Sequence, residues 1–402
     1  MNRLIAYPGG SKGAALLVML LAMVLAFSAV LIASLAQGNP QIERQQKTLK
    51  ALAQAKQALI AWSVVQGDTG TASLRRPGTL PCPDKNFFGN ANSGNASGSC
   101  SSGGETSIGR LPWKSLGMEQ LYDAHGETLW YAVSDHFRNP TQNTKAAVNS
   151  DAEGSLLLYA ANGSTLLTPN GEELAAIVFA PGPPLSGQDR VALPDAASSY
   201  LDAFNGKNNA KAAGPFIMGP VSDSSGNPVV NDLVIGISAR ELIAALEKRA
   251  LNEAQNALKS YFAENGSYPN PAPANGDNCT SPINKVQSTT PECASASGTC
   301  YGRLPEDLLA PYVASWFPQN GWGRVMIYAI NDNGVACPTS LNVDGKPKSY
   351  VLIAPGTARN GQNRQSLLLS DYLEDSGNTD GWSGNPDFVT PGAGSNDQLR
   401  AE

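Results

Sequence analysis

The sequence predicts an α+β protein in which an N-terminal transmembrane helix precedes two tandem copies of one unit, each an amphipathic helix plus an antiparallel sheet. Three observations predict this fold: a long uncharged stretch near the N-terminus, sequence blocks that recur in the same order in both halves, and apolar segments of strand length after a helical pattern in each half. With 402 residues, 42% of them hydrophobic, the chain is long enough to fill two cores.

The charge balance excludes one class of partner. The net charge is −6 at pH 7 and only 15% of the residues are charged, so we expect no basic face that could neutralise a phosphate backbone. The sequence therefore predicts that nucleic acid is not a partner.

The N-terminal region predicts a short basic leader, residues 1–13, and a membrane span, residues 14–35. The span is 22 residues without a charge, and as a helix it would cover about 33 Å, the thickness of a hydrocarbon core. The basic leader is expected in the cytoplasm and the chain from about residue 37 outside. One alternative stays open: residues 34–36 offer small side chains where an ordinary signal peptidase requires them, and cleavage there would release the protein.

A sequence repeat of nearly two hundred residues predicts two copies of one fold. The matching blocks are 51–59 and 250–258, 109–112 and 302–305, 129–133 and 326–330, 180–182 and 354–356, and 187–190 and 361–364. The offset between matching positions falls from 199 to 174 residues along the unit, so the second copy has shorter loops. We expect a first domain over 41–237 and a second over 238–402.

Each unit is expected to begin with an amphipathic helix. In the first unit, apolar residues recur at helical spacing from Ile42 to Val64. In the second unit, Ser238 and Glu241 form a capping box and Gly266 is a C-cap residue, so these positions bound a helix. The strands expected after the helices are 156–160, 175–179 and 233–237 in the first unit, and 325–330 and 350–353 in the second.

The six cysteines predict disulfides. No Cys-x-x-Cys pair occurs, and the two histidines, His125 and His136, lie far from any paired thiols in the sequence, which disfavours zinc. Cys82 and Cys279 each lie between the helix and the matching block at 109–112 or 302–305, and Cys100 and Cys300 each precede that block. The repeat therefore suggests equivalent bridges in the two copies. The predicted pairs are Cys82–Cys100, Cys279–Cys300 and, peculiar to the second unit, Cys293–Cys337.

A family resemblance emerges from the leader, helix and sheet patterns together. The leader ends at Gly13, an apolar helix follows directly, its amphipathic continuation reaches about Gln66, and a sheet with a cysteine-bearing loop comes next. Residues 320–324 with Tyr328 look like the Trp-Gly turn that leads into a sheet strand of major pseudopilins. In these features the chain resembles type IV pilins and type II secretion pseudopilins. The resemblance implies cleavage by a prepilin peptidase between Gly13 and Ala14.

The resemblance also implies a location and partners: a single-pass inner-membrane protein, its bulk periplasmic or extracellular in a filament, that contacts the inner membrane and other pilin-like subunits. In most family members the fifth residue after the cleavage point is glutamate, whereas here it is Val18. A buried glutamate in lipid is costly unless it is paired with a neighbouring subunit, so its absence removes both that cost and a docking contact. This favours a minor or tip subunit with a structural role, not an enzyme. The alternative is a membrane-anchored or released extracytoplasmic binding module that does not assemble.

Signals for catalysis and for cofactors are weak. Residues 9–13 match Gly-x-Ser-x-Gly but lie in the leader without a preceding strand, and residues 204–207 predict a turn rather than a phosphate loop. Because similar pseudopilins bind calcium in loops, the resemblance makes Asn331, Asp332 and Asn333 candidate ligands. Their spacing lacks the remaining ligands of a complete calcium loop, so a plain turn is the simpler interpretation.

Overall fold

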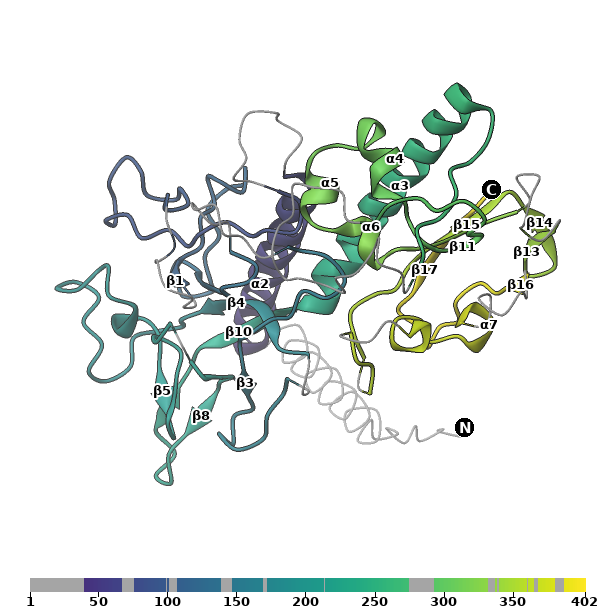
Figure 1. Ribbon diagram of the computed structural model, residues 1–402. Helices are drawn as coiled ribbons and strands as arrows, with labels where there is room; N and C mark the ends of the chain where they lie inside the picture. Colours follow the sequence, from purple (N-terminus) through teal and green to yellow (C-terminus); the bar gives the residue numbers. More distant parts are fainter. Residues whose placement is uncertain are drawn as a thin grey trace, which may run out of the picture. The chain divides into compact units, whose positions relative to one another are not determined.

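The computed structural model describes most of the chain from residue 40 onward. The described residues are 40–66, 76–98, 100, 107–138, 147–168, 172–212, 214–274, 293–331, 337, 340–359, 361–364, 368–379 and 387–402. The chain divides into two compact units, Met1–Lys47 and Thr48–Glu402. From Thr48 onward, both copies of the repeat lie within the second unit, which Figure 1 colours from purple to yellow along the sequence.

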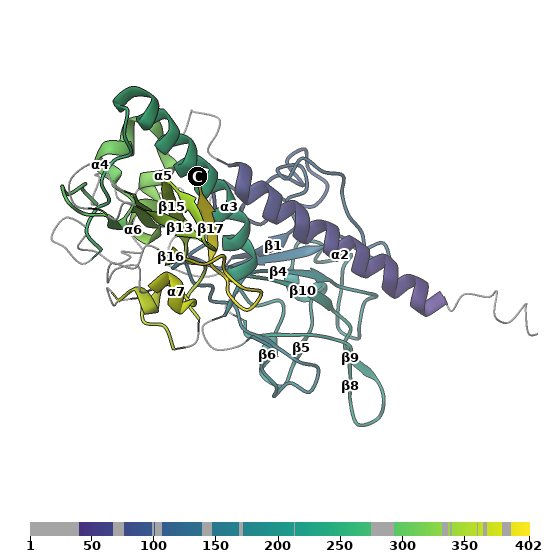
Figure 2. The same ribbon diagram turned by 90° about the vertical axis from the view of Figure 1, so that its right-hand side faces the viewer.

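The first copy is a helix followed by a four-stranded antiparallel sheet. Helix α2 (Pro40–Val65) precedes β1 (Ser107–Arg110), β2 (Trp130–Val133), β4 (Leu174–Ala180) and β10 (Leu233–Ser238), which pair in the order β1-β2-β4-β10. In Figure 2, α2 runs across this sheet. Leu52 and Leu59, two turns apart on one side of α2, are fully buried in the same apolar cluster as Tyr131 and Val178 of the sheet.

Strand β4 is buried on both of its faces. Val178 and its alternate neighbours face the cluster that contains the helices, while Ile177 and Phe179 face a second apolar cluster on the other side. Because successive side chains of a strand point to opposite faces, this placement accounts for the unbroken apolar sequence of β4.

The second copy repeats this topology. Helix α3 (Ala239–Asn265) precedes β11 (Tyr301–Arg303), β12 (Ile327–Ile330), β15 (Tyr350–Ala354) and β17 (Gln398–Ala401), which pair antiparallel in the order β11-β12-β15-β17. Helix α3 begins with the predicted capping box: the Glu241 N–H donates to Ser238 Oγ (3.1 Å) and the Ser238 N–H donates to Glu241 Oε2 (3.2 Å). It ends at Gly266, with φ +73°. The predicted bounds of this helix are confirmed.

The remaining elements are short. The strands are β3 (Leu158–Tyr159), β5 (Ala203–Phe204), β6 (Lys207–Asn208), β7 (Phe216–Ile217), β8 (Val221–Ser222), β9 (Pro228–Val230), β13 (Leu341–Val343), β14 (Lys346–Lys348) and β16 (Asp387–Phe388). The helices are α4 (Glu306–Leu309), α5 (Trp316–Gln319), α6 (Trp322–Val325), α7 (Ser376–Thr379), η1 (Ala197–Ser199), η2 (Ala310–Tyr312) and η3 (Leu369–Asp371). The turn predicted at 204–207 joins β5 to β6 as a hairpin.

Helices α2 and α3 are parallel and staggered where they meet. Lys56 Nζ lies 2.7 Å from the Glu241 carboxylate, and Arg249 donates to the Val64 carbonyl, so residue numbers rise together along both helices. These neighbours are 185 residues apart, whereas the matching sequence blocks at the start of the repeat are 199 apart. One copy is therefore displaced along the other by about 14 residues, or about 21 Å of helix.

The two copies share one core. A single apolar cluster contains Leu52 and Tyr131 from the first copy together with Leu246, Trp322 and Leu352 from the second. The expected boundary between 237 and 238 falls at the junction of β10 and α3, but the copies do not form separate compact units.

Polar contacts also join the copies, at Asn320. This fully buried side chain accepts at Oδ1 from Arg76 Nη1 (3.0 Å) and from the Val148 N–H (3.2 Å), and donates from Nδ2 to the Pro77 carbonyl (3.0 Å). Its own carbonyl accepts from Asn149 Nδ2 (2.7 Å).

Two expectations from the sequence are corrected here. Across the part of the chain that the structure describes, no helix combines the length and apolar composition of a membrane span, and the long helices begin at Pro40 and Ala239. This finding overturns the fold as predicted, with its transmembrane helix, and the inner-membrane single-pass location; the α+β class and the small antiparallel sheets remain. The predicted span itself, residues 14–35, lies outside the described residues.

Two strand predictions also need correction. The expected strand 156–160 is reduced to β3, which pairs in parallel with β7. The expected strand 325–330 starts later, because Val325 ends helix α6. In both places the apolar run is longer than the strand within it: Leu156 forms only an isolated bridge with Leu174, and the run at 325–330 begins with the end of α6.

Candidate functional site

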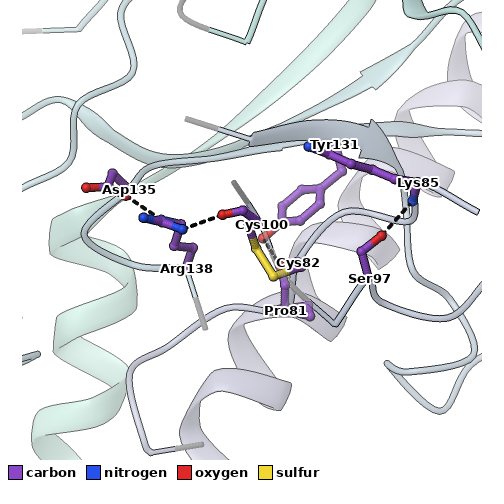
Figure 3. Close-up of a disulfide and its surroundings, with 8 residues drawn as sticks. All are labelled: Pro81, Cys82, Lys85, Ser97, Cys100, Tyr131, Asp135 and Arg138. Carbon is purple, nitrogen blue, oxygen red and sulfur yellow. Dashed lines mark hydrogen bonds and ion pairs between the residues drawn. A yellow bond between two sulfur atoms is a disulfide. The ribbon is translucent and has the colours of Figure 1, made fainter. Parts of the chain in front are cut away.

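The disulfide of the first copy joins Cys82 to Cys100, as predicted. Figure 3 shows its surroundings: Tyr131 Oη donates to the Pro81 carbonyl (3.2 Å), and Arg138 donates both to the Cys100 carbonyl and to the Asp135 carboxylate. The bridge joins the two ends of the loop between its cysteines, and these hydrogen bonds hold both ends against β2 and the segment that follows it.

In the second copy the predicted pairing is wrong. Cys300 is bonded to Cys337, which excludes the predicted pairs Cys279–Cys300 and Cys293–Cys337. Cys293 is also disulfide-bonded, and Cys279 lies outside the described residues. The reason is the antiparallel pairing of β11 with β12: the Ile330 N–H donates to the Cys300 carbonyl (2.9 Å), so the chain that leaves β12 passes beside Cys300.

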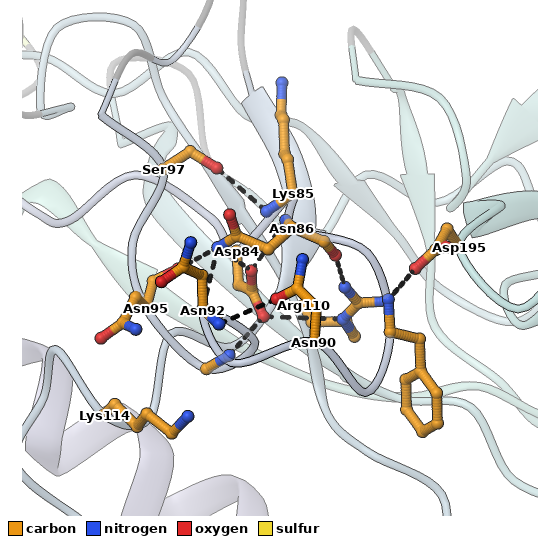
Figure 4. Close-up of polar contacts among 12 residues, drawn as sticks. Asp84, Lys85, Asn86, Asn90, Asn92, Asn95, Ser97, Arg110, Lys114 and Asp195 are labelled. Carbon is orange, nitrogen blue, oxygen red and sulfur yellow. Dashed lines mark hydrogen bonds and ion pairs between the residues drawn. The ribbon is translucent and has the colours of Figure 1, made fainter.

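The loop closed by the first disulfide is organised around a buried aspartate, as Figure 4 shows. Asp84 Oδ1 accepts from the N–H and the Nδ2 of Asn86 (2.9 and 2.8 Å), and Oδ2 accepts from the Gly94 N–H (2.7 Å). Arg110 places Nε 3.6 Å from Asp84 Oδ2 and donates from Nη1 to Asp195 Oδ1 (2.8 Å). A second loop, around Asp195, is thereby joined to the first.

This loop does not have the character of a cation site. Arg110 already supplies a positive charge beside Asp84, and N–H groups fill both oxygens of that carboxylate. The cavity bordered by Asp84, Arg110 and Trp113 has a volume of about 10 Å³, room for about one water molecule. No cluster of three or more His, Cys, Asp or Glu side chains suited to a metal ion occurs among the described residues.

A second polar arrangement occurs once in each copy, where the third strand of the sheet ends and the fourth begins. In the first copy, Arg190 donates from Nη1 to the Gly182 carbonyl (2.9 Å) and from Nε to the Ser199 carbonyl (3.0 Å). Its guanidinium lies 4.9 Å from the centroid of the Tyr200 ring and forms an ion pair with Glu127 (2.7 Å). Arg190 therefore holds the chain that leaves β4.

Two aspartates complete the arrangement in the first copy. Asp202 accepts at Oδ1 from Gln188 Nε2 (2.8 Å) and at Oδ2 from the Asn231 N–H (2.8 Å). Asp232 accepts at Oδ2 from the Asp202 N–H (2.8 Å) and from Asn209 Nδ2 (2.9 Å). Asp232 directly precedes β10, so these bonds hold the chain as it enters the fourth strand.

The second copy repeats the arginine contacts. Arg364 donates from Nη2 to the Gly356 carbonyl (3.0 Å), and its guanidinium lies 4.8 Å from the centroid of the Tyr372 ring. It also lies 3.7 Å from the carboxylate of Asp151, a residue of the first copy. An ion pair between Arg364 and Asp151 therefore connects the arrangement in the second copy to the first copy.

The acids of the second copy have the same partners. Glu374 accepts at Oε1 from Gln362 Nε2 (3.0 Å) and at Oε2 from the Asn396 N–H (3.0 Å). Asp397 Oδ2 accepts from the Glu374 N–H (3.2 Å), and Asp397 directly precedes β17.

We call each arrangement a strand-end lock. The first lock consists of Gly182, Gln188, Arg190, Tyr200, Asp202, Asn231 and Asp232, and the second of Gly356, Gln362, Arg364, Tyr372, Glu374, Asn396 and Asp397. Both glycines have positive φ, +68° and +64°; a Cβ on Gly356 would collide with Asn396, and one on Gly182 would press tightly against Asn231. Every member of one lock therefore has a counterpart in the other.

Burial changes the proton affinity of the lock acids. Asp232 is fully buried, and burial together with the neighbouring Asp202 carboxylate raises its pKa well above the usual range. Burial and the neighbouring Glu374 raise the pKa of Asp397 to about 8. Burial also raises the pKa of Asp202.

The other residues singled out in the sequence do not gather at one place. The Asn331 N–H donates to the Ser349 carbonyl (3.2 Å) at the end of β12, whereas Asp332 and Asn333, like Gly13 and Ala14, lie outside the described residues. His136 bonds to the Ala147 carbonyl (2.9 Å).

The matching sequence blocks contain only three of the seven members of each lock. The matching blocks contain the glycine, the glutamine and the arginine, but not the tyrosine, the acids or the asparagine. A signal was present: Tyr-Leu-Asp at 200–202 matches Tyr-Leu-Glu at 372–374, and Asn-Asp precedes the last strand of both copies.

Comparisons of the chain with models of protein families, with curated proteins and with solved structures find no match.

Proposed function

We propose that the protein is a pilin-like subunit with a structural role in the assembly of a type IV pilus or a type II secretion pseudopilus, of the minor or tip type. The observation that carries the proposal is the repeated unit. In each copy a long helix precedes a four-stranded antiparallel sheet, and a disulfide-bonded cysteine comes shortly before the first strand.

The packing of the copies supports a role in assembly. Parallel helices α2 and α3 meet with a stagger of about 14 residues, so the contact joins two different faces of one fold. Contacts between different faces of a repeated unit produce rings when the rotation closes and filaments when it does not. A unit that already packs in this way within one chain fits a subunit that packs among similar units.

Processing gives the first test. The proposal expects prepilin peptidase to cut between Gly13 and Ala14, so the N-terminal sequence of the mature protein should begin at Ala14. A mature chain that begins at Gln37 would contradict the proposal, because an ordinary signal peptidase and not a prepilin peptidase would then have made the cut.

Cross-linking in cells gives the second test. A photoreactive residue at Gln54, on the exposed side of α2, should capture other pilin-like proteins at a low ratio, whereas one at Ser224, on the exposed turn between β8 and β9, should not. Long ladders of this chain alone would identify a major subunit instead.

A second candidate is a binding module that never assembles. It is favoured by exposed apolar side chains on hydrogen-bonded loops: Phe87 is 75% exposed and Val191 is 92% exposed, and Asp195 holds the Phe88 N–H at 2.6 Å. Apolar groups held in this way suit a contact with a partner. Failure to capture any pilin-like protein from Gln54, with correct folding, would favour this candidate.

A further inference from the structure

The two strand-end locks share a feature that their hydrogen bonds leave unexplained. Among the described contacts, Oδ1 of Asp232 and Oδ1 of Asp397 are buried and accept no hydrogen bond, although Oδ2 of each acid does. Their partner acids, Asp202 and Glu374, accept N–H donors at both oxygens. Each lock therefore contains two neighbouring carboxyl groups, with one oxygen of the four left open.

The chemistry of two adjacent carboxyl groups indicates what the oxygen without a hydrogen bond carries. Two adjacent buried carboxylates cannot both carry a charge without a large cost, and a protonated carboxyl group gains one O–H donor that a carboxylate lacks. A proton on the open oxygen would satisfy that oxygen and would supply the neighbouring acid with a further donor. The same open oxygen in two copies with different loops points to one shared cause.

We propose that each strand-end lock holds one proton, carried on Oδ1 of Asp232 or of Asp397 and donated to Asp202 or Glu374, and that loss of this proton loosens the lock. The raised pKa of both proton-carrying acids agrees with this assignment, since burial and the adjacent carboxylate are its causes. The proposal is independent of the function proposed above.

A metal ion suits the locks less well than a proton. Each lock offers two carboxyl groups, and the other three of their four oxygens already accept N–H donors. Calcium takes six to eight oxygen ligands, and Arg190 or Arg364 lies in the same lock.

Other charged and titratable groups lie near each pair of acids and affect their proton binding. Around the first acid pair they are Glu127, Arg190 and Tyr200. Around the second they are Asp151, Glu247, Arg359, Arg364 and Tyr372, of which Glu247 binds Gln398 next to Asp397. No histidine belongs to either lock, so a response near neutral pH would come from carboxyl groups.

The sign of the effect follows from the two states. The native lock keeps its proton up to a pKa of about 8 at Asp397, while the unfolded chain releases it near the ordinary aspartate pKa of 3.8. Between these values the native state binds more protons than the unfolded state. Stability therefore falls as pH rises, by up to about tenfold in the folding equilibrium constant per pH unit for each shared proton.

Amide substitutions provide the test, on the full chain. In Asp232→Asn and Asp397→Asn, the Nδ2 group takes the place of the proton-bearing oxygen and donates to the partner acid at every pH. Urea unfolding from pH 5 to 8 measures how the folding equilibrium constant falls as pH rises. In the double variant this fall should be less steep than in the wild type, by up to about two powers of ten per pH unit. An unchanged decline would overturn the proposal.

The partner acids serve as matched controls. An amide at Asp202 or Glu374 must place an NH₂ group against an existing N–H donor, because donors fill both oxygens of each acid. Asp202→Asn and Glu374→Gln should therefore lower the folding equilibrium constant at pH 6 at least tenfold more than Asp232→Asn and Asp397→Asn. Equal effects within each pair would show that the proton has no fixed position.

A measurement that does not depend on unfolding completes the test. Infrared spectra of the folded chain at pH 7 should contain the carbonyl band of protonated carboxyl groups, and this band should weaken in Asp232→Asn and in Asp397→Asn. A wild-type spectrum without such a band would overturn the proposal even if the stability of the variants agreed with it.

Discussion

Replacing Asn320 by alanine should weaken the packing between the two copies. Its side chain contacts three groups of the first copy: the Arg76 guanidinium, the Val148 N–H and the Pro77 carbonyl. Arg76 is only 2% exposed, and burial lowers its pKa to about 10. The amide of Asn320 therefore compensates groups that have lost their contact with water.

The expected cost follows from these contacts. A buried donor or acceptor that loses its partner costs about 1–3 kcal/mol, and bonds to charged groups lie at the upper end. Asn320→Ala removes three such bonds and leaves a small cavity, so we expect a loss of about 3–5 kcal/mol in the free energy of unfolding.

Urea unfolding of the full chain, followed by fluorescence and circular dichroism, measures this loss as a lower midpoint. The matched control is Asn342→Ala, because that amide makes one bond at the surface, from Nδ2 to Asp387 Oδ1 (2.8 Å); its cost should stay below about 1 kcal/mol. If Asn320→Ala also costs less than about 1 kcal/mol, the polar contacts at Asn320 do not stabilise the packing of the copies.

Three further predictions concern other parts of the chain. Burial raises the pKa of Glu247 to about 7 from its ordinary value of 4.5, so its contribution is greatest below pH 4.5 and declines toward pH 7; Glu247→Gln should remove about 3 kcal/mol of that decline in pH-dependent unfolding. Peptide mapping without reduction should join Cys82 to Cys100 and Cys300 to Cys337, and a Cys279–Cys300 peptide would contradict the fold of the second copy. Arg190→Lys should lower stability by about 2–3 kcal/mol in thermal or urea unfolding, because lysine cannot donate to several carbonyls from one planar group; a change below about 0.5 kcal/mol would count against the role of the lock.

Elements with local causes were predictable from the sequence. The start and end of α3 depend on Ser238, Glu241 and Gly266, all within the helix ends themselves. Strands β4 and β15 are short apolar runs between turns, and both lie where such runs were expected. In contrast, residues 156–160 form only a two-residue strand, because their pairing with β7 depends on a distant segment.

The second disulfide shows where comparison of the copies fails. After the second strand, Arg138 of the first copy donates to the Cys100 carbonyl, whereas Cys337 of the second copy bonds covalently to Cys300. Both contacts attach the same stretch of chain to the same cysteine position. Matching the cysteines by their order in the sequence therefore missed that one copy uses a disulfide where the other uses a hydrogen bond.

The motif at 109–112 and 302–305 has the same sequence in both copies, but only some of its residues have the same contacts in both. Its glycine has one role in both copies: a neighbouring segment pairs with the first strand, and a Cβ would collide with the carbonyl of Asp84 or of Ala272. Its arginine has two roles, since Arg110 binds acids of loops, whereas Arg303 donates to a carbonyl and lies 4.0 Å from the Tyr372 ring centroid.

The strand-end locks differ from that motif because all of their members keep both position and contact. Arg190 and Arg364 each donate to the glycine carbonyl and cover a tyrosine ring, although the loops around them differ in length and sequence. A contact that is the same in both copies, although the loops around it differ, serves a need of the repeated fold and not of one particular loop. Here that need is to hold the entry of the fourth strand against the exit of the third, at the two ends of a long connection whose closure costs conformational entropy.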